Sequence, residues 1–388
     1  MHAFTTPEPT GAEDADLVQR PNSATPHLRS RRHVPLTADS DEFGFRRELY
    51  HTLGGLISGS STRPFGLGAC GHDALVETRD GSVAAFSSPG GYRRRGMPNQ
   101  DGLVLCPGEG CVVVDGTGGG RAGRAAALNV AVNSTAALEK GLRGLDVFRS
   151  ASERLAQTQA LEGASAAMGY VWKDAERPLL HVGRCADIRI MLLDGVSGRL
   201  KYESRDNSLV QQLIDGRVQP RMLFFALHYL SRKQVVKPLD LFRESGLPLP
   251  APSARCTEEY FRQMPEDEQR SLSHGLIRIL ARHEDALLSG LIADNKYRCY
   301  PEEAELYSSY RHISGVPAGE GFVDEDASCD LVSYQPGDRA FLCSDGVTAY
   351  LDRRSILSYL RGGEILQLVQ LLERIEAHDN LTGALIRL

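Results

Sequence analysis

Five aspartates carry the chemistry that this sequence suggests most strongly. Asp115 and Asp345 each follow a short apolar stretch and precede a glycine, and Asp101 and Asp379 border similar stretches. Asp187 lies between two more. A carboxylate that leaves water without a partner costs free energy, and several carboxylates at one sheet edge would repel one another. Divalent cations remove this penalty, so the pattern predicts a metal site where these strand ends meet.

The residue types also indicate which metals would bind. Mg²⁺ and Mn²⁺ are hard ions that prefer oxygen ligands, whereas structural zinc sites use closely spaced Cys and His. The chain has 8 Cys, and no two of them form a CxxC pair. Gly116 lacks a side chain, so its carbonyl oxygen can also approach a metal. A single Asp-Gly pair is typical of a plain turn, and only the set of aspartates together indicates a site.

The glycine-rich stretch 116–120 has a second interpretation, because such loops can bind phosphates before a helix. A nucleotide-binding P-loop, however, would continue with Gly-Lys and then Ser or Thr. No such residues follow here, so a nucleotide site is disfavoured.

Short strands and helices must position these aspartates. Two hairpins are predicted, one joining 74–78 to 83–86 and the other joining 103–106 to 111–114. The other predicted strands are 166–172, 179–182, 188–193, 330–334, 339–343 and 381–388. The predicted helices are 124–145, 151–160, 222–230, 276–281 and 363–377. Because strands and helices do not alternate regularly, the order favours an α+β fold over a doubly wound parallel sheet.

Composition divides the chain into two parts. Residues 1–45 are rich in Pro, Ser, Thr and charge, which predicts a disordered tail. Residues 46–388 are predicted to form one domain that carries a helical insertion at about 218–310. That insertion would form either a lid over the site or an extra helical layer.

The overall composition narrows the classes of function. The 388 residues are 41% hydrophobic, and 44 Lys+Arg against 50 Asp+Glu give a net charge of −6. A basic nucleic-acid-binding surface is therefore disfavoured. No apolar run approaches the ~20 residues of a membrane span, and no secretory signal is recognisable. We expect a cytoplasmic protein with reduced thiols.

The order of motifs resembles the metal-dependent protein phosphatases of the type 2C (PPM) family. The resemblance covers about residues 70–388 and rests on six motifs, which lie at 95–101, 114–119, 186–189, 206–213, 336–346 and 379–382. It implies two packed antiparallel β-sheets flanked by helices, with a binuclear Mg²⁺ or Mn²⁺ centre at one end. A helical insertion at about 218–310 would be longer than the matching part of compact bacterial members.

The resemblance also assigns the metal ligands. Asp115 would bridge both metals, and the carbonyl of Gly116 would complete one of the two sites. Asp345 and Asp379 would hold the second metal. Asp187 matches a position that helps to hold a weaker third ion in some members of the family.

Two further roles concern water and substrate. By resemblance, Asp101 would orient a metal-bound water from outside the ligand set. The family's phosphate-binding arginine usually lies three residues before Asn99, where this chain has Gly96. Arg95 is the nearest substitute, since a guanidinium matches phosphate oxygens in pairs. Gln100 also stands where the family usually has Glu.

The implied reaction is hydrolysis of phosphoserine or phosphothreonine. Two divalent metals would clamp the phosphate and lower the pKa of a bridging water, and the resulting hydroxide would displace the serine or threonine oxygen. The alternative is a regulatory or binding module that keeps the fold but turns over poorly. The expected partners are a phosphorylated protein and a regulatory protein at the insertion or the tail, with no nucleic acid and no membrane.

Overall fold

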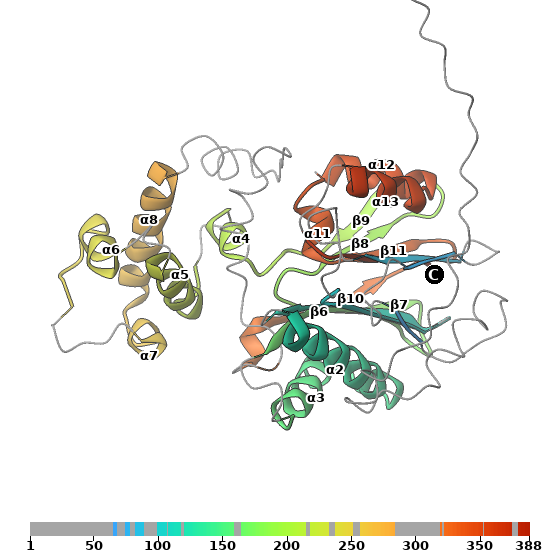
Figure 1. Cartoon of the computed structure of the whole chain (residues 1–388), viewed down its shortest axis with the longest axis horizontal. Helices are drawn as coiled ribbons and strands as arrows, with labels where there is room; N and C mark the ends of the chain where they lie inside the picture. The colour runs from blue at the N-terminus through green and yellow to red at the C-terminus, as the bar shows by residue number, and fades with distance from the viewer. Residues whose placement is uncertain are drawn as a thin grey trace, which may run out of the picture.

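Two antiparallel six-stranded sheets pack face to face at the centre of this computed structural model (Figure 1). One sheet has the order β1 (Phe65–Leu67), β4 (Asp101–Cys106), β5 (Gly110–Thr117), β6 (Ser165–Lys173), β7 (Leu179–Cys185) and β10 (Ala327–Ser333). The other has the order β2 (Ala74–Glu77), β3 (Val83–Ser88), β12 (Leu381–Arg387), β11 (Arg339–Cys343), β8 (Arg189–Leu193) and β9 (Leu200–Glu203). The predicted fold class is confirmed, and both predicted hairpins form.

The structure describes a defined part of the chain. Its described residues are 65–67, 74–77, 82–88, 99–106, 108–117, 120–158, 164–214, 218–232, 237–250, 257–283, 319, 322–351, 353–374 and 379–388. The predicted tail 1–45 and Arg95 lie outside these ranges.

Helices cover the outer face of each sheet, so most strands are buried on both sides. Between the sheets, residues such as Val113 and Leu342 form one apolar core. The alternate residues face outward: Val112 packs under α2 (Gly120–Glu139) and α3 (Leu145–Ala156). In the same way, Phe341 packs under α12 (Arg353–Gly362) and α13 (Ile365–Arg374). Burial on both faces explains the continuous apolar strand sequences.

Several predicted helices differ from the structure in their extent: the helix predicted over 151–160 is α3, and the one predicted over 276–281 is part of a longer helix, Glu266–His283. In two further cases glycine is the reason. The helix predicted over 124–145 ends at Glu139, because Gly141 has a φ of 88° and Gly144 a φ of 63°. The helix predicted over 363–377 is preceded by α12, which was not predicted, and Gly363 with a φ of 71° separates α12 from α13. These left-handed conformations suit glycine and end a helix.

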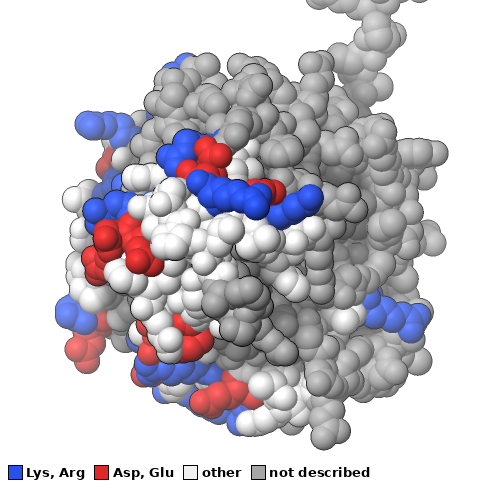
Figure 2. Space-filling model, turned by 90° about the vertical axis from the view of Figure 1, so that its left-hand side faces the viewer, with Lys and Arg blue, Asp and Glu red and all other residues white. Residues whose placement is uncertain are grey.

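The insertion is helical, as predicted, in its described residues. Its helices are α5 (Pro220–Arg232), α6 (Pro238–Glu244), α7 (Glu258–Arg262) and α8 (Glu266–His283), and they follow the short helix α4 (Leu209–Ile214). They form a group beside the sandwich (Figure 1). Figure 2 shows the face of the molecule on which these helices lie, and the described basic and acidic side chains are interspersed there. No helix among the described residues is long and apolar enough to cross a membrane.

A buried aspartate fixes the turns at one end of the second sheet. Asp338, in the turn between β10 and β11, is 2% exposed and accepts hydrogen bonds from Lys201 Nζ at 2.6 Å and from the backbone N–H of Gly195 at 2.9 Å. The backbone N–H of Gln335 donates a third at 2.9 Å. Burial alone would raise the pKa of Asp338, but these donors lower it below its ordinary value of 3.8.

We expect Asp338→Asn to lower the free energy of unfolding by about 1–3 kcal/mol at pH 7, because it removes the charge that Lys201 and two N–H groups stabilise. A carboxylate whose pKa falls on folding stabilises the fold above its unfolded pKa, and this contribution is lost as pH falls through the folded pKa. The difference between the variant and the wild type should therefore shrink below about pH 4. Urea denaturation of both proteins at pH 7 and pH 3.5 measures this difference in the free energy of unfolding.

The matched control is Asp267→Asn, at an exposed position on α8. This change should shift the free energy of unfolding by no more than about 0.5 kcal/mol at either pH. If Asp338→Asn behaved like the control, or if its effect grew at low pH, the account of this turn would be wrong.

Candidate metal centre

The register of the first sheet places two of the five aspartates side by side. Asp101 begins β4 and pairs directly with Asp115, near the end of β5. Directly opposed residues of antiparallel strands have Cβ atoms about 4.5–5.5 Å apart. Like charges in that position are unfavourable without a counterion.

Asp345 and Asp379 reach the same end of the molecule from the second sheet. Asp345 follows β11 and begins the short helix α11 (Asp345–Thr348), and Asp379 comes just before β12. Gly346 allows these two segments to lie close together, because it has no side chain. A Cβ there would lie 1.9 Å from the carbonyl oxygen of Asn380 and 3.3 Å from Asp379 Cβ. Only glycine permits this approach.

Polar contacts join the two sheets at this end. Ser344 Oγ donates a hydrogen bond to Asp101 Oδ2 at 2.8 Å, and it accepts one from the backbone N–H of Thr382 at 3.1 Å. The backbone N–H of Gln100 donates to Asn380 Oδ1 at 3.0 Å. The segments that carry four of the aspartates are therefore connected to one another.

The glycines after Asp115 allow close packing against the start of α2. A Cβ at Gly116 would lie 1.9 Å from the carbonyl oxygen of Gly123. The backbone N–H of Gly116 donates to the carbonyl oxygen of Gln100 at 3.2 Å. This explains part of the glycine-rich stretch without any bound nucleotide.

Asp187 lies in the turn between β7 and β8 and is 5% exposed. The preceding residue, Ala186, has a φ of 66°, an uncommon conformation for a residue with a side chain. Its carbonyl oxygen accepts a hydrogen bond from the backbone N–H of Asn207 at 2.8 Å. The strained turn is thus held from outside, as strained backbone at functional sites usually is.

The electrostatics show that the five carboxylates act on one another. Burial, followed by the charges of Asp101, Asp345, Asp379 and Asp187, raises the pKa of Asp115 well above its usual range. Burial is also the main cause that raises the pKa of Asp101 to about 7; Ser344 lowers it and Asp379 raises it further. Clustered carboxylates with raised pKa values are a site that a positive charge would stabilise.

The donor set fits a hard divalent cation in its chemistry. It consists of oxygens alone, and Asp101 Oδ1 is buried without a hydrogen-bond partner in the described part of the chain. The side chains do not form a closed ligand shell, since no three His, Cys, Asp or Glu among the described residues are grouped so that they could hold an ion. The carboxylates are therefore gathered at one end of the sandwich.

Sequence reasoning missed the side chains that connect the aspartates. Ser344 and Thr382 join Asp101 to the second sheet, and Asn99 donates through Nδ2 to Ser87 Oγ at 2.8 Å. Their only signal was their position beside the aspartates. Arg95, the expected phosphate-binding residue, lies outside the described residues.

Solved structures similar to this chain include serine/threonine phosphatases. PstP of Mycobacterium tuberculosis has 19% identity and a TM-score of 0.46 over 79% of this chain and 97% of that chain. The PPM Ser-Thr phosphatase MsPP of Mycobacterium smegmatis has 15% identity and a TM-score of 0.47, covering 79% and 98%. PppA of Pseudomonas aeruginosa has 18% identity and a TM-score of 0.48, covering 79% and 96%. No family model and no curated protein matches the sequence.

Proposed function

We propose that the protein is a metal-dependent phosphoprotein phosphatase that hydrolyses phosphoserine and phosphothreonine, with two or three Mn²⁺ or Mg²⁺ ions as cofactors. One observation carries the proposal: strand pairing and hydrogen bonds bring five aspartates from distant parts of the chain to one end of the sandwich. Neither the packing of the core nor the closing of a turn requires such a gathering, and bound cations would offset its cost while the carboxylates stay ionised.

Each aspartate has a separate role in this proposal. Asp115, with the carbonyl oxygen of Gly116, together with Asp345 and Asp379, would hold two ions, and Asp187 would help to hold a weaker third. When bound, the ions would polarise the phosphoryl group and supply a water of lowered pKa. No nucleophilic side chain is then required.

The remaining roles concern orientation. Asp101 has one oxygen held by Ser344 and the other buried without a partner among the described residues, so it would accept a proton or a hydrogen bond from water. Arg95 would bind the substrate phosphate through paired N–H groups. The substrate is a phosphorylated protein, and the insertion or the N-terminal tail would contact a regulatory partner.

One observation favours a second function, that of a regulatory or binding module. Three residues before Asn99, where the phosphatase family that the sequence resembles usually has its phosphate-binding arginine, this chain has Gly96, which would suit a regulatory or binding module with weak turnover. The two functions differ in one measurable property, which is metal-dependent hydrolysis.

The test is hydrolysis of p-nitrophenyl phosphate and of a phosphothreonine peptide, with and without added Mn²⁺. We expect Mn²⁺ to stimulate both reactions, and Asp345→Asn to lower the stimulated rate about 10²-fold or more, because it removes a metal ligand. Wild-type protein that hydrolysed neither substrate faster than Asp345→Asn would favour the binding module.

A further inference from the structure

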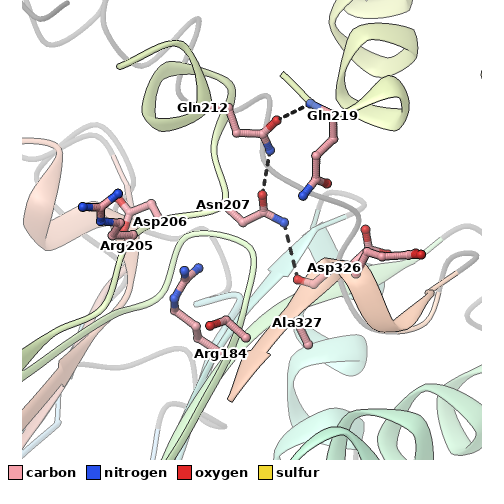
Figure 3. A pocket seen from close by; sticks show the side chains of 10 residues that line it. Arg184, Arg205, Asp206, Asn207, Gln212, Gln219, Asp326 and Ala327 are labelled. Atoms are coloured by element: carbon pink, nitrogen blue, oxygen red, sulfur yellow. Dashed lines mark hydrogen bonds between the residues drawn. The ribbon is translucent and has the colours of Figure 1, made fainter. Parts of the chain in front are cut away.

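A polar cavity of about 310 Å³ lies where the sandwich meets the helices that lead into the insertion (Figure 3). Its lining comes from the end of β7, the start of β10, the segment after β9, and helix α4. The size is near the lower end of the ~300–1,000 Å³ typical of small-molecule sites. None of the residues that line the cavity is assigned a role in the proposed phosphatase reaction.

The charged side chains of the lining are Arg184, Arg205, Asp206, Glu325 and Asp326, and Arg184 comes from the sandwich itself. It lies on β7 in alternation with Leu180 and Val182, which pack between the two sheets. Its side chain therefore belongs to the face between the sheets, and its guanidinium extends toward Asn207 (Figure 3). Its Nε is buried, and no acceptor among the described residues is within hydrogen-bonding distance.

Two of the three carboxylates that line the cavity are engaged by other groups. Asp206 accepts two hydrogen bonds from Arg189, at 2.9 and 2.6 Å. Asp326 pairs with Arg221 at 2.7 Å and accepts from the backbone N–H of Val323 at 3.0 Å. The third, Glu325, is exposed, and no hydrogen bond or ion pair joins Arg184 to a carboxylate among the described residues, although the charge of Asp206 acts on it. A largely buried cation without a directly bonded anion is costly.

Side-chain amides form the opposite wall. Gln212 Nε2 donates to Asn207 Oδ1 at 2.7 Å, and Asn207 Nδ2 donates to the carbonyl oxygen of Asp326 at 3.4 Å (Figure 3). The backbone N–H of Gln219, just before α5, donates to Gln212 Oε1 at 2.9 Å. This chain of hydrogen bonds fixes the wall that faces the guanidinium.

We propose that this cavity binds a small molecule through a single oxyanion, a carboxylate or phosphoryl group, that pairs with Arg184. A guanidinium offers parallel N–H donors that match two oxygens of such a group. Glu325 is exposed at the cavity, and its charge disfavours a ligand with several negative charges. The ligand would sit at the base of the insertion, where it contacts both the sandwich and the segment that leads to α5.

The experiment measures anion binding to protein from which metals have been removed on a chelating resin, so the metal centre does not contribute. Sodium phosphate and sodium acetate are the probes, and sodium chloride at equal ionic strength is the reference. We expect one or both probes to bind the wild type by titration calorimetry and to raise its melting temperature above the chloride value. Arg184→Met should weaken that binding about tenfold or more.

Arg243→Met, at an exposed position on α6, is the matched control because it removes the same charge far from the cavity, and it should bind as the wild type does. Circular dichroism checks the fold, and Arg184→Gln replaces Arg184→Met if that variant unfolds. The proposal is overturned if neither probe binds the wild type more than chloride does, or if both Arg184 variants bind normally. An equal loss in Arg243→Met would also overturn it. The phosphatase proposal is unaffected by any of these results.

Discussion

Replacement of Asp115 by Asn is expected to lower Mn²⁺-dependent phosphatase activity about 10³-fold or more while leaving the protein folded. Asp115 lies directly opposite Asp101, and the charges of all four other aspartates raise its pKa. It is therefore at the electrostatic centre of the group, where loss of one carboxylate removes the most metal affinity. Initial rates on a phosphothreonine peptide, measured across a range of Mn²⁺ concentrations, provide the test.

The same substitution should have the opposite effect on stability. Without metal, Asp115→Asn removes one of several mutually repelling carboxylates, so the free energy of unfolding should rise by about 1 kcal/mol. Mn²⁺ should stabilise the wild type because it binds only the folded state, and it should not stabilise the variant. Urea denaturation with and without Mn²⁺ separates these effects.

Asp146→Asn serves as the control, because Asp146 is exposed on α3 and pairs only with Arg149 among the described residues. Its activity and its response to Mn²⁺ should match those of the wild type. A variant at Asp115 that kept more than about a tenth of the activity, or that Mn²⁺ stabilised normally, would remove this residue from the proposed centre.

The strands were the most predictable part of the fold, for a physical reason. Most strands of the sandwich are buried on both faces, so their sequences are continuous apolar runs bounded by glycine, proline or charge. Both hairpins, 74–86 and 103–114, follow from such runs. Strand β9 was not predicted, because its sequence Leu200–Glu203 is short and only partly buried at the edge of the sheet.

The contacts that join the segments carrying the aspartates could not be predicted from local sequence. That Asp101 faces Asp115 follows from a hairpin, but its contact with Ser344 joins residues 243 positions apart. The approach of Gly346 to Asn380 likewise depends on how β11 pairs with β12. The sequence therefore identified the aspartates as a group, whereas the contacts that connect them required the tertiary structure.

A second large effect is expected on stability, at a buried ion pair next to the turn that holds Asp187. Arg189 donates to both carboxylate oxygens of Asp206, at 2.9 and 2.6 Å, and to Glu203 Oε1 at 2.8 Å. The Asp206 side chain is 0% exposed. Arg189→Met leaves that carboxylate buried without its partner, so we expect the free energy of unfolding to fall by about 3–5 kcal/mol.

The double variant Arg189→Met/Asp206→Leu shows whether Arg189→Met is unstable because the ion pair is lost or because the packing of the arginine side chain is lost. Replacement of both members of a buried pair by apolar residues is often nearly neutral, so the double variant should recover most of the stability. Arg243→Met, which breaks the exposed pair with Asp240, should cost no more than about 1 kcal/mol. Urea denaturation of the wild type, Arg189→Met, the double variant and Arg243→Met measures this recovery, and a double variant as unstable as Arg189→Met would show that the arginine acts through packing rather than through its charge.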